Sequence, residues 1–224
     1  MSVFLFDIDG TLLSSGGAGR LAMERALTDV FHVNQEIPPG MLSGRSDRGI
    51  IRNLFELNGI AESEENIARF VENYLVQLPE ALGERSGSIL PGVVELIDRL
   101  KDASAHIGLL TGNMVRGARI KLSHHGLMDH FPFGAFGDLR LTRDEIAHDA
   151  LQIVREHVHV DVQPEQIWII GDTPRDIACA RAIGAKVIAV ATGVHEHAEL
   201  HGLQPDVVVN DLTDVASLQP ALEF

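Results

Sequence analysis

The sequence predicts an α/β fold built on a parallel sheet with helices on both faces, and two observations support this prediction. Short apolar runs alternate with helical patterns along most of the chain, and the runs are apolar at successive positions, as strands buried on both faces are. The 224 residues, 45% of them hydrophobic and 22% charged, suffice for one sizeable domain or for one domain with a smaller insert. Strands and helices that alternate in this way form a Rossmann-like parallel sheet sandwiched by helices.

Six apolar runs are the candidate strands, and most of them are followed by Gly, Asp or Thr. They are Val3–Phe6, His106–Leu110, a weaker Phe133–Phe136, Ile167–Ile170, Lys186–Val190 and Val207–Val209. The helices expected among them are Val93–Lys101, Val115–His124, Asp144–His157 and Arg175–Ile183. Pro91 and Pro174 lie near two of these helix starts, and Gly184 follows the last helix, as is common at helix ends.

Residues 15–88 break this alternation. They contain no convincing strand and show helical periodicity, as at Leu21, Arg25 and Ile50-Ile51. Small, flexible residues suited to hinges flank them, at 14–17 and 84–88. An insert of this length exceeds a simple crossover between two strands. We therefore expect a catalytic core formed by residues 1–14 and 89–224, and an α-helical cap domain formed by residues 15–88.

The charge balance narrows the range of partners. Eighteen Lys and Arg residues against 32 Asp and Glu give a net charge of −14 at pH 7. Such a surface repels phosphate backbones and anionic lipid, so we expect neither a nucleic-acid binder nor a membrane-surface binder. A small anionic substrate would need a local device that overcomes this field.

The cysteine count and the hydropathy indicate a protein of the cytoplasm. Cys179 is the single cysteine, which excludes an internal disulfide, a redox pair and a cysteine-built zinc site. No apolar run reaches the roughly 18 residues of a membrane helix. The first residues have no basic start, and Asp7 interrupts them too early for a signal peptide. Nothing indicates an assembly, so a monomer is the default expectation.

Acidic residues follow two of the predicted strands. Asp7 and Asp9 come directly after the first strand, Thr111 follows the second, and Asp172 and Asp176 follow the fourth. In open α/β sheets ligands bind beyond the carboxyl ends of the strands, so these side chains should converge. Crowded carboxylates repel one another unless a cation intervenes, and Mg²⁺ favours such oxygen ligands. The sequence thus predicts a Mg²⁺ site, which would also reverse the local field for an anion.

Three segments make the resemblance specific: Asp7-Ile8-Asp9-Gly10-Thr11, Leu110-Thr111-Gly112-Asn113 and Gly171-Asp172-Thr173-Pro174-Arg175-Asp176. In order, spacing and strand context they resemble the signature motifs of the haloacid dehalogenase superfamily, in its phosphoglycolate-phosphatase-like branch. The resemblance covers nearly the whole chain, and it includes a helical cap between the first and second motifs.

The resemblance implies a Mg²⁺-dependent phosphatase acting on a small phosphorylated metabolite. Asp7 would be the nucleophile that forms an aspartyl phosphate, and Asp9 would be the general acid and base. Mg²⁺ would be held by the Asp7 carboxylate, the Asp9 backbone carbonyl and Asp172, with Asp176 ordering a metal-bound water or supporting the site from behind. Thr111, with the backbone N–H groups of Gly112 and Asn113, would hold the phosphoryl oxygens. Dehalogenation is disfavoured, because dehalogenases of the superfamily lack an acid at the position of Asp9.

One departure from the pattern concerns a lysine. The family usually places a Lys before its fourth strand, and none of Lys101, Lys121 and Lys186 falls there. Arg140 and Arg143 do, and we favour Arg143 because Thr142 resembles the N-cap of the following helix. An Arg offers a bidentate fork to a phosphoryl group, which a Lys does not. The alternative is a surface Arg paired with a helix acid.

Substrate choice is expected to lie in the cap. Arg45, in a polar loop, is a candidate for meeting a second anionic or polar group of the substrate, whereas Ser46 or Asp47 would be a plain helix N-cap. His195, His197 and His201 do not form a known zinc pattern and are expected to be solvated. Two other functions remain open: a phosphosugar mutase of the same superfamily, and a non-catalytic phosphate-binding regulatory protein.

Overall fold

A six-stranded sheet forms the centre of the molecule. The computed structural model describes residues 2–38 and 40–222. The strand order is β5-β4-β1-β6-β7-β8, and all neighbouring strands are parallel. The strands are β1 (Val3–Phe6), β4 (His106–Leu110), β5 (Gly134–Ala135), β6 (Ile167–Gly171), β7 (Lys186–Val190) and β8 (Val207–Val209). The predicted α/β class is confirmed, although β5 is shorter than expected, because this edge strand pairs with β4 alone.

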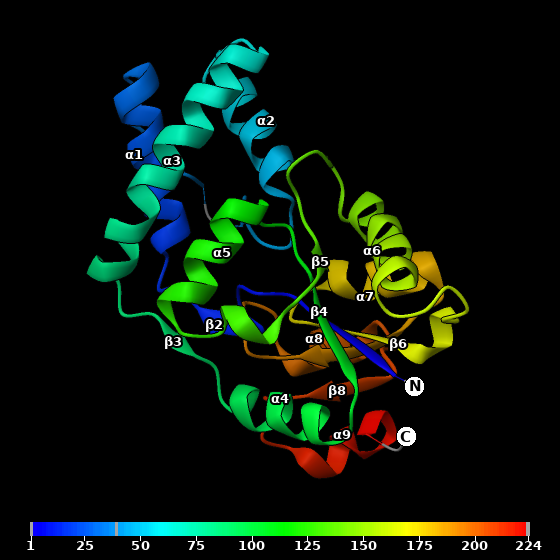
Figure 1. The fold of residues 1–224 in the computed structure, drawn as a ribbon. Helices are drawn as coiled ribbons and strands as arrows, with labels where there is room; N and C mark the ends of the chain where they lie inside the picture. The colour runs from blue at the N-terminus through cyan, green and yellow to red at the C-terminus, as the bar shows by residue number, and fades with distance from the viewer. Residues whose placement is uncertain (1, 39, 223–224) are drawn as a thin grey trace.

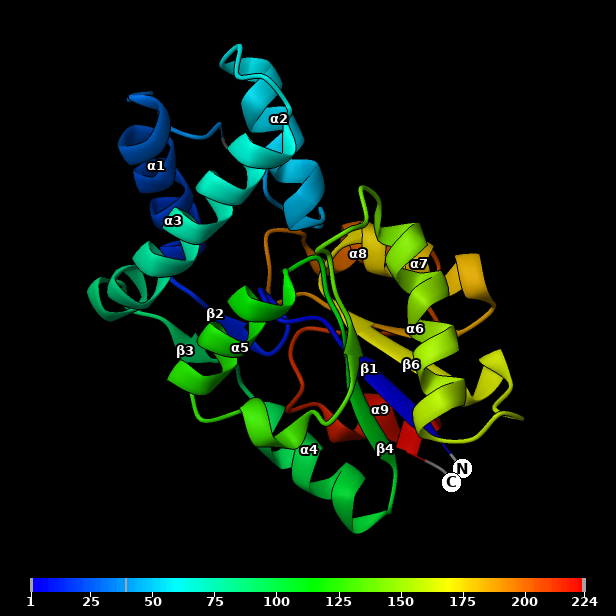
Figure 2. The ribbon, with the colours of Figure 1, turned by 45° about the horizontal axis from the view of Figure 1, so that its top comes forward.

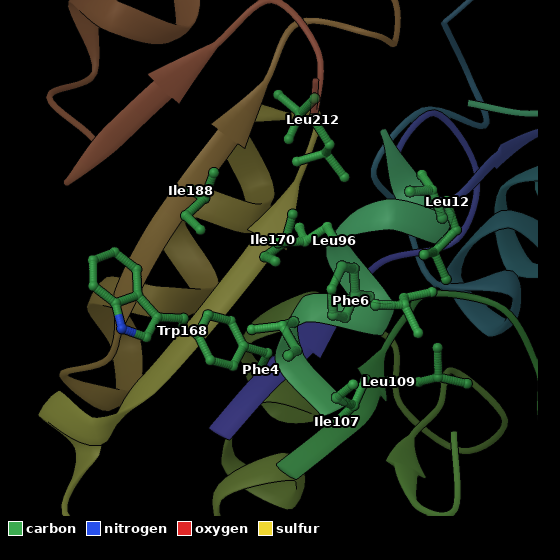
Figure 3. Packing of buried hydrophobic residues seen from close by; sticks show 14 of the residues in the cluster. Phe4, Phe6, Leu12, Leu96, Ile107, Leu109, Trp168, Ile170, Ile188 and Leu212 are labelled. Atoms are coloured by element: carbon green, nitrogen blue, oxygen red, sulfur yellow. The ribbon is translucent and has the colours of Figure 1, made fainter. Parts of the chain in front are cut away.

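Alternation along the strands gives the sheet two apolar faces. In β1, Phe4 and Phe6 point into one cluster of buried side chains, and Val3 and Leu5 point into another. The first cluster lies under α4 (Val93–Asp102), α5 (Val115–His124) and α9 (Val215–Leu222). Figure 3 shows Phe4 and Phe6 in it between Trp168, Ile170 and Leu109. The second lies under α6 (Arg143–His157), α7 (Pro174–Ile183) and α8 (His197–Gly202). The central strand is therefore buried from both sides and holds its carboxyl end in a fixed place.

The helices of the sheet layer follow the predicted segments closely. They are α4 (Val93–Asp102), α5 (Val115–His124), α6 (Arg143–His157) and α7 (Pro174–Ile183), with two short helices, α8 (His197–Gly202) and α9 (Val215–Leu222), that the periodicity does not show. Their ends have clear local causes. Thr142 and Thr173 form capping boxes with Glu145 and Asp176, and Gly184 ends α7 with a positive φ of 73°.

We call residues 15–88 the helical insert, and its described part contains three helices. These are α1 (Ala18–Phe31), α2 (Asp47–Leu57) and α3 (Glu64–Glu84). The insert is joined to the rest by a short antiparallel pair of strands, β2 (Leu13–Ser14) and β3 (Ser88–Ile89). Strands of two residues carry no periodicity, which is why the sequence does not reveal this pair. In Figures 1 and 2 the insert stands to one side of the sheet, with α5 between it and the strands.

The insert has its own apolar cluster. Small residues of α1 and larger side chains of α2 and α3 pack together, with Phe55 at the centre. The ring of Phe55 meets the edges of Phe31 and Phe70 at centroid distances of 5.3 and 5.8 Å. Aromatic pairs of this geometry add to the hydrophobic stabilisation of the cluster.

We predict that Phe55→Ala lowers the free energy of unfolding by about 3–5 kcal/mol, because it removes a fully buried ring and leaves a cavity. The matched control is Leu57→Ala on the same helix, whose side chain is 49% exposed, and which should change stability by less than about 0.5 kcal/mol. Urea denaturation followed by circular dichroism measures both. Equal losses in the two variants would contradict the packing described.

Candidate functional site

The sheet topology brings the predicted residues together. Strands β4, β1 and β6 are neighbours, and Thr111, Asp7 and Asp172 directly follow their respective carboxyl ends. The ladders continue past two of these ends, since the N–H of Asp7 donates to the carbonyl of Ile170 at 2.9 Å and that of Thr111 to Ala135 at 3.1 Å. All three side chains are buried. Asp7 and Asp172 line the edge of one cavity, and Thr111 lies just beneath it.

Asp7, Asp172 and Asp176 form a buried acidic cluster. Oxygens of the three carboxylates lie within 4.8 Å of one another. Burial raises the pKa of Asp7 to about 6 even though Arg143 opposes it. Burial, followed by the charges of Asp176 and Asp7, raises the pKa of Asp172 well above its usual range. Carboxylates that resist ionisation in this way form a donor set suited to a hard cation such as Mg²⁺, which would favour their charged forms.

Asp172 is enclosed closely. The Thr11 hydroxyl donates to its Oδ1 at 3.0 Å. Gly10 and Gly193 lie against the same carboxylate, and a Cβ at either position would collide with it. Gly10 also has a φ of +87°, which side-chain-bearing residues rarely adopt. The loop after β1 and the loop after β7 therefore hold Asp172 in one orientation toward Asp7.

Arg143 lies in the acidic cluster, at the first residue of α6. Its guanidinium is 3.3 Å from Asp7 Oδ1 and also binds Asp176 Oδ1. The other oxygen of Asp176 accepts from the N–H and the hydroxyl of Thr173, at 3.0 and 2.7 Å. Both oxygens of Asp176 are thus in use, and this side chain supports Arg143. Arg140, in contrast, pairs with Asp149 at 2.7 Å near the surface.

Asp9 stands apart from the acidic cluster. Its Oδ2 accepts from Lys121 Nζ at 2.6 Å and from Asn113 Nδ2 at 2.9 Å. Burial acts to raise the pKa of Asp9, but the charge of Lys121 and hydrogen bonds with Lys121, Asn113 and Ser15 outweigh it and lower that pKa below the ordinary value. Asn113 Nδ2 also donates to Thr111 Oγ1 at 2.9 Å, which links the loops after β1 and β4.

Two residues of this site were missed from the sequence: Lys121 and Asp47. Lys121 lies on the buried face of α5 with Ala118 and Leu122, and a charge on an otherwise apolar helix face is the signal that reveals it. Asp47 is a buried carboxylate at the start of α2. It accepts from the N–H of Met114 at 2.8 Å, and its own N–H donates to the Gly112 carbonyl at 2.7 Å.

The segment 45–49 of the insert packs on the core through its backbone. Arg48 N–H donates to the Gly137 carbonyl at 3.4 Å, and Ser46 Oγ donates to the Leu141 carbonyl at 2.9 Å. Gly112 and Gly137 allow this, because a Cβ on Gly112 would strike the Arg45 carbonyl and one on Gly137 would strike the Gly112 carbonyl. Ser46 is the N-cap of α2, accepting from Gly49 N–H at 3.1 Å, as expected for the plainer of the two interpretations.

A cavity of about 870 Å³ lies between the insert and the strand ends. Asp7, Asp9, Asp172, Lys121 and Arg143 line its core side. The exposed Arg45 and several other insert residues line the opposite side, among them Arg20, Met23, Glu24, Asp47 and Tyr74. All predicted site residues except Thr111 and Asp176 thus line this cavity, and those two are fully buried just beneath it.

The histidines noted in the sequence have partners outside the acidic cluster. His195 is bound to Glu199 at 2.9 Å, and the rings of His197 and His201 stack on each other. Within residues 2–38 and 40–222 the acidic trio is the group that can offer three ligands to a metal. The same residues include no helix of the length and apolarity that a bilayer span requires.

Comparisons with known proteins identify relatives along nearly the whole chain. The family model of haloacid dehalogenase-like hydrolases matches residues 4–190. A phosphoglycolate phosphatase of Nitrosococcus oceani is 23% identical over 217 residues, covering 96% of this chain and 95% of the relative. A phosphoglycolate phosphatase of Synechococcus elongatus is 26% identical over 216 residues, covering 96% and 95%. The crystal structure of CbbY from Rhodobacter sphaeroides, in complex with phosphate, has the same fold, with a TM-score of 0.77 at 19% identity and coverage of 98% and 99%.

The expectation of an enzyme of the phosphatase type is confirmed by these relatives, and so is the resemblance to the phosphoglycolate-phosphatase-like branch. The match of the family model over most of the sheet, from β1 to β7, includes all three motifs. The chain belongs to the haloacid dehalogenase-like hydrolase family.

Proposed function

We propose that this protein hydrolyses a small phosphate monoester through an aspartyl phosphate on Asp7, with Mg²⁺ as its metal. One observation carries the proposal: the Asp7 carboxylate lies between two acidic partners and the Arg143 guanidinium, at the floor of a cavity that Asp9 also lines. A carboxylate in this position can act as a nucleophile toward phosphorus while cationic groups balance the incoming phosphoryl charge.

In the first half of the reaction Asp7 bonds to phosphorus and the bond from phosphorus to the leaving oxygen breaks. Asp9, two residues further on, gives its proton to that oxygen. In the second half Asp9 takes a proton from water, the water oxygen bonds to phosphorus, and the bond to Asp7 breaks. Arg143 and the Thr111 hydroxyl, both beside Asp7, hold phosphoryl oxygens throughout.

The metal site fits the same residues. Carboxylate oxygens of Asp7 and Asp172, with the backbone carbonyl of Asp9, would hold Mg²⁺. When bound, the ion neutralises the acidic cluster and stabilises charge on the phosphoryl group. Asp176 keeps Arg143 in place, since both of its oxygens are already bonded.

The helical insert acts as a cap in this proposal. Its segment 45–49 closes one side of the cavity, where closure limits the entry of bulk water and brings side chains of the insert to the substrate. Arg45 lines the cavity with its side chain exposed, and it would meet a second anionic group of the substrate. Phosphoglycolate, with a carboxylate beside its phosphate, is a substrate of this kind.

Purified protein with Mg²⁺ should hydrolyse p-nitrophenyl phosphate, and EDTA should stop the reaction until Mg²⁺ is added in excess. Asp7→Asn should abolish turnover, because the amide is not a nucleophile. Asp102→Asn, an exposed aspartate of α4, is the control and should keep full activity. A clean, metal-loaded preparation that turns over no phosphate ester would contradict the proposal, and sugar isomerisation without phosphate release would assign a mutase instead.

Arg143→Met should lower kcat by a factor of about 10²–10³, as expected when a donor to transition-state charge is removed. Arg140→Met is the matched control: it breaks an exposed ion pair with Asp149 and should change kcat less than twofold. Circular dichroism checks that both variants fold. If Arg140→Met lost as much activity as Arg143→Met, the assignment of the arginine would be wrong.

Arg45→Ala should raise KM for phosphoglycolate about tenfold, equivalent to about 1.4 kcal/mol. It should leave kcat/KM for p-nitrophenyl phosphate within about twofold, because that ester has no second anion to lose. Arg52→Ala, an exposed arginine of α2 paired with Glu62, serves as control. A similar loss on both esters would show that Arg45 acts on the phosphoryl group or on folding.

A further inference from the structure

Lys121 is a charged side chain in the protein interior, where burial of a charge costs free energy. It belongs to α5 and is 4% exposed, with apolar Ala118 and Leu122 on the same helix face. A buried ammonium group is stable only when carboxylates or other polar hydrogen-bond acceptors contact it. These partners come from residues outside α5, so the packing of the helix alone does not explain the buried position of Lys121.

The partners of Lys121 are residues of the proposed chemistry. Its Nζ donates to Asp9 Oδ2 at 2.6 Å and to Asn113 Oδ1 at 2.7 Å. Asn113 in turn donates to the same Oδ2 of Asp9 at 2.9 Å. The bonds from Lys121 and from Asn113 thus reach the same oxygen of the Asp9 carboxylate. The other oxygen, Oδ1, takes neither of these two bonds, and a hydrogen bond with the Ser15 side chain is a further contact of this carboxylate.

Lys121 lies on the Asp9 side of the cavity. Among the residues that the structure describes, its hydrogen bonds reach Asp9 and Asn113 and not the acidic cluster of Asp7, Asp172 and Asp176. The start of α1 covers the ammonium: a Cβ added at Gly19 would lie 3.5 Å from Nζ, in ordinary contact. Between Asp9, Asn113 and α1 the ammonium is enclosed, so the arrangement favours an action on Asp9 over direct contact with phosphate.

We propose that Lys121 is a positioning residue, which fixes the Asp9 carboxylate so that Oδ1 faces the leaving oxygen of the substrate. This rests on the proposed function, in which Asp9 gives a proton to that oxygen as its bond to phosphorus breaks and regains one from water. Without Lys121, Asp9 keeps only the hydrogen bonds of the neutral Asn113 and Ser15 side chains and can rotate away from the leaving oxygen.

The test compares two esters that differ in their need for a proton. An alkyl phosphate such as phosphoglycolate expels an alkoxide that must be protonated, whereas p-nitrophenolate leaves without a proton. Lys121→Met should lower kcat for phosphoglycolate at least about 100-fold, in the range of general acid catalysis, and kcat for p-nitrophenyl phosphate less than about tenfold. KM should change less than about threefold for both. Lys121→Arg, which keeps a cationic donor, should recover part of the loss.

Asp9→Asn should show the same selectivity between the esters, and the double variant with Lys121→Met should lose little more than Asp9→Asn alone, because the two residues act as one unit. Arg116→Met is the control: it lies on α5 as well, and its exposed pair with Glu72 connects α5 to α3. It should leave both esters unaffected. If Lys121→Met does not fold, Lys121→Gln, which retains an N–H donor, carries the comparison between the esters.

Equal losses on the two esters, or a rise in KM with unchanged kcat, would overturn the inference and make Lys121 a structural or substrate-binding group. Fully additive losses in the double variant would overturn it as well. These outcomes are separate from failure of the proposed function, which would show as an active Asp7→Asn variant or as a wild-type protein inactive on both esters.

Discussion

The repulsion among carboxylates at one edge of the sheet is the constraint on which the site depends. The strand order places Asp7 and Asp172 on neighbouring strand ends, and the turn into α7 adds Asp176. Leaving three such groups buried and ionised is unfavourable without cations. Arg143 supplies one positive charge to this cluster, and the donor set is suited to a divalent ion for the rest.

Two buried cationic side chains contact different carboxylates of the site. Arg143 comes from α6, on one face of the sheet, and meets Asp7 and Asp176. Lys121 comes from α5, on the other face, and meets Asp9. The carboxylates at positions 7 and 9 follow the same strand, yet they experience opposite effects: the pKa of Asp7 is raised and that of Asp9 is lowered. The two neighbouring carboxylates are thus distinguished by their cationic partners, Arg143 for Asp7 and Lys121 for Asp9.

The sequence predicts most of the sheet and the acidic residues at its edge, because buried parallel strands are short apolar runs and their ends are marked by Asp, Gly or Thr. Arg143 was expected from its place before a helix with a clear N-cap, and the structure puts it beside Asp7. The sequence does not reveal the place of Lys121, because it depends on the tertiary packing of α5 and not on local spacing. The sequence around Asp47 indicates a possible helix cap, whereas in the structure its carboxylate binds Met114 N–H across the boundary with the core.

Part of the contact between the insert and the core is made by main-chain atoms. Gly112 and Gly137 let the segment 45–49 approach so closely that peptide groups of three loops meet directly. Ser46 and Asp47 add side-chain hydrogen bonds to the same junction. Because this junction lies at the start of α2, other residues of α1, α2 and α3 that line the cavity can diverge while the insert keeps its place on the core. Substrate selectivity can therefore change through substitutions of the insert residues that line the cavity, while the catalytic residues at the strand ends stay the same.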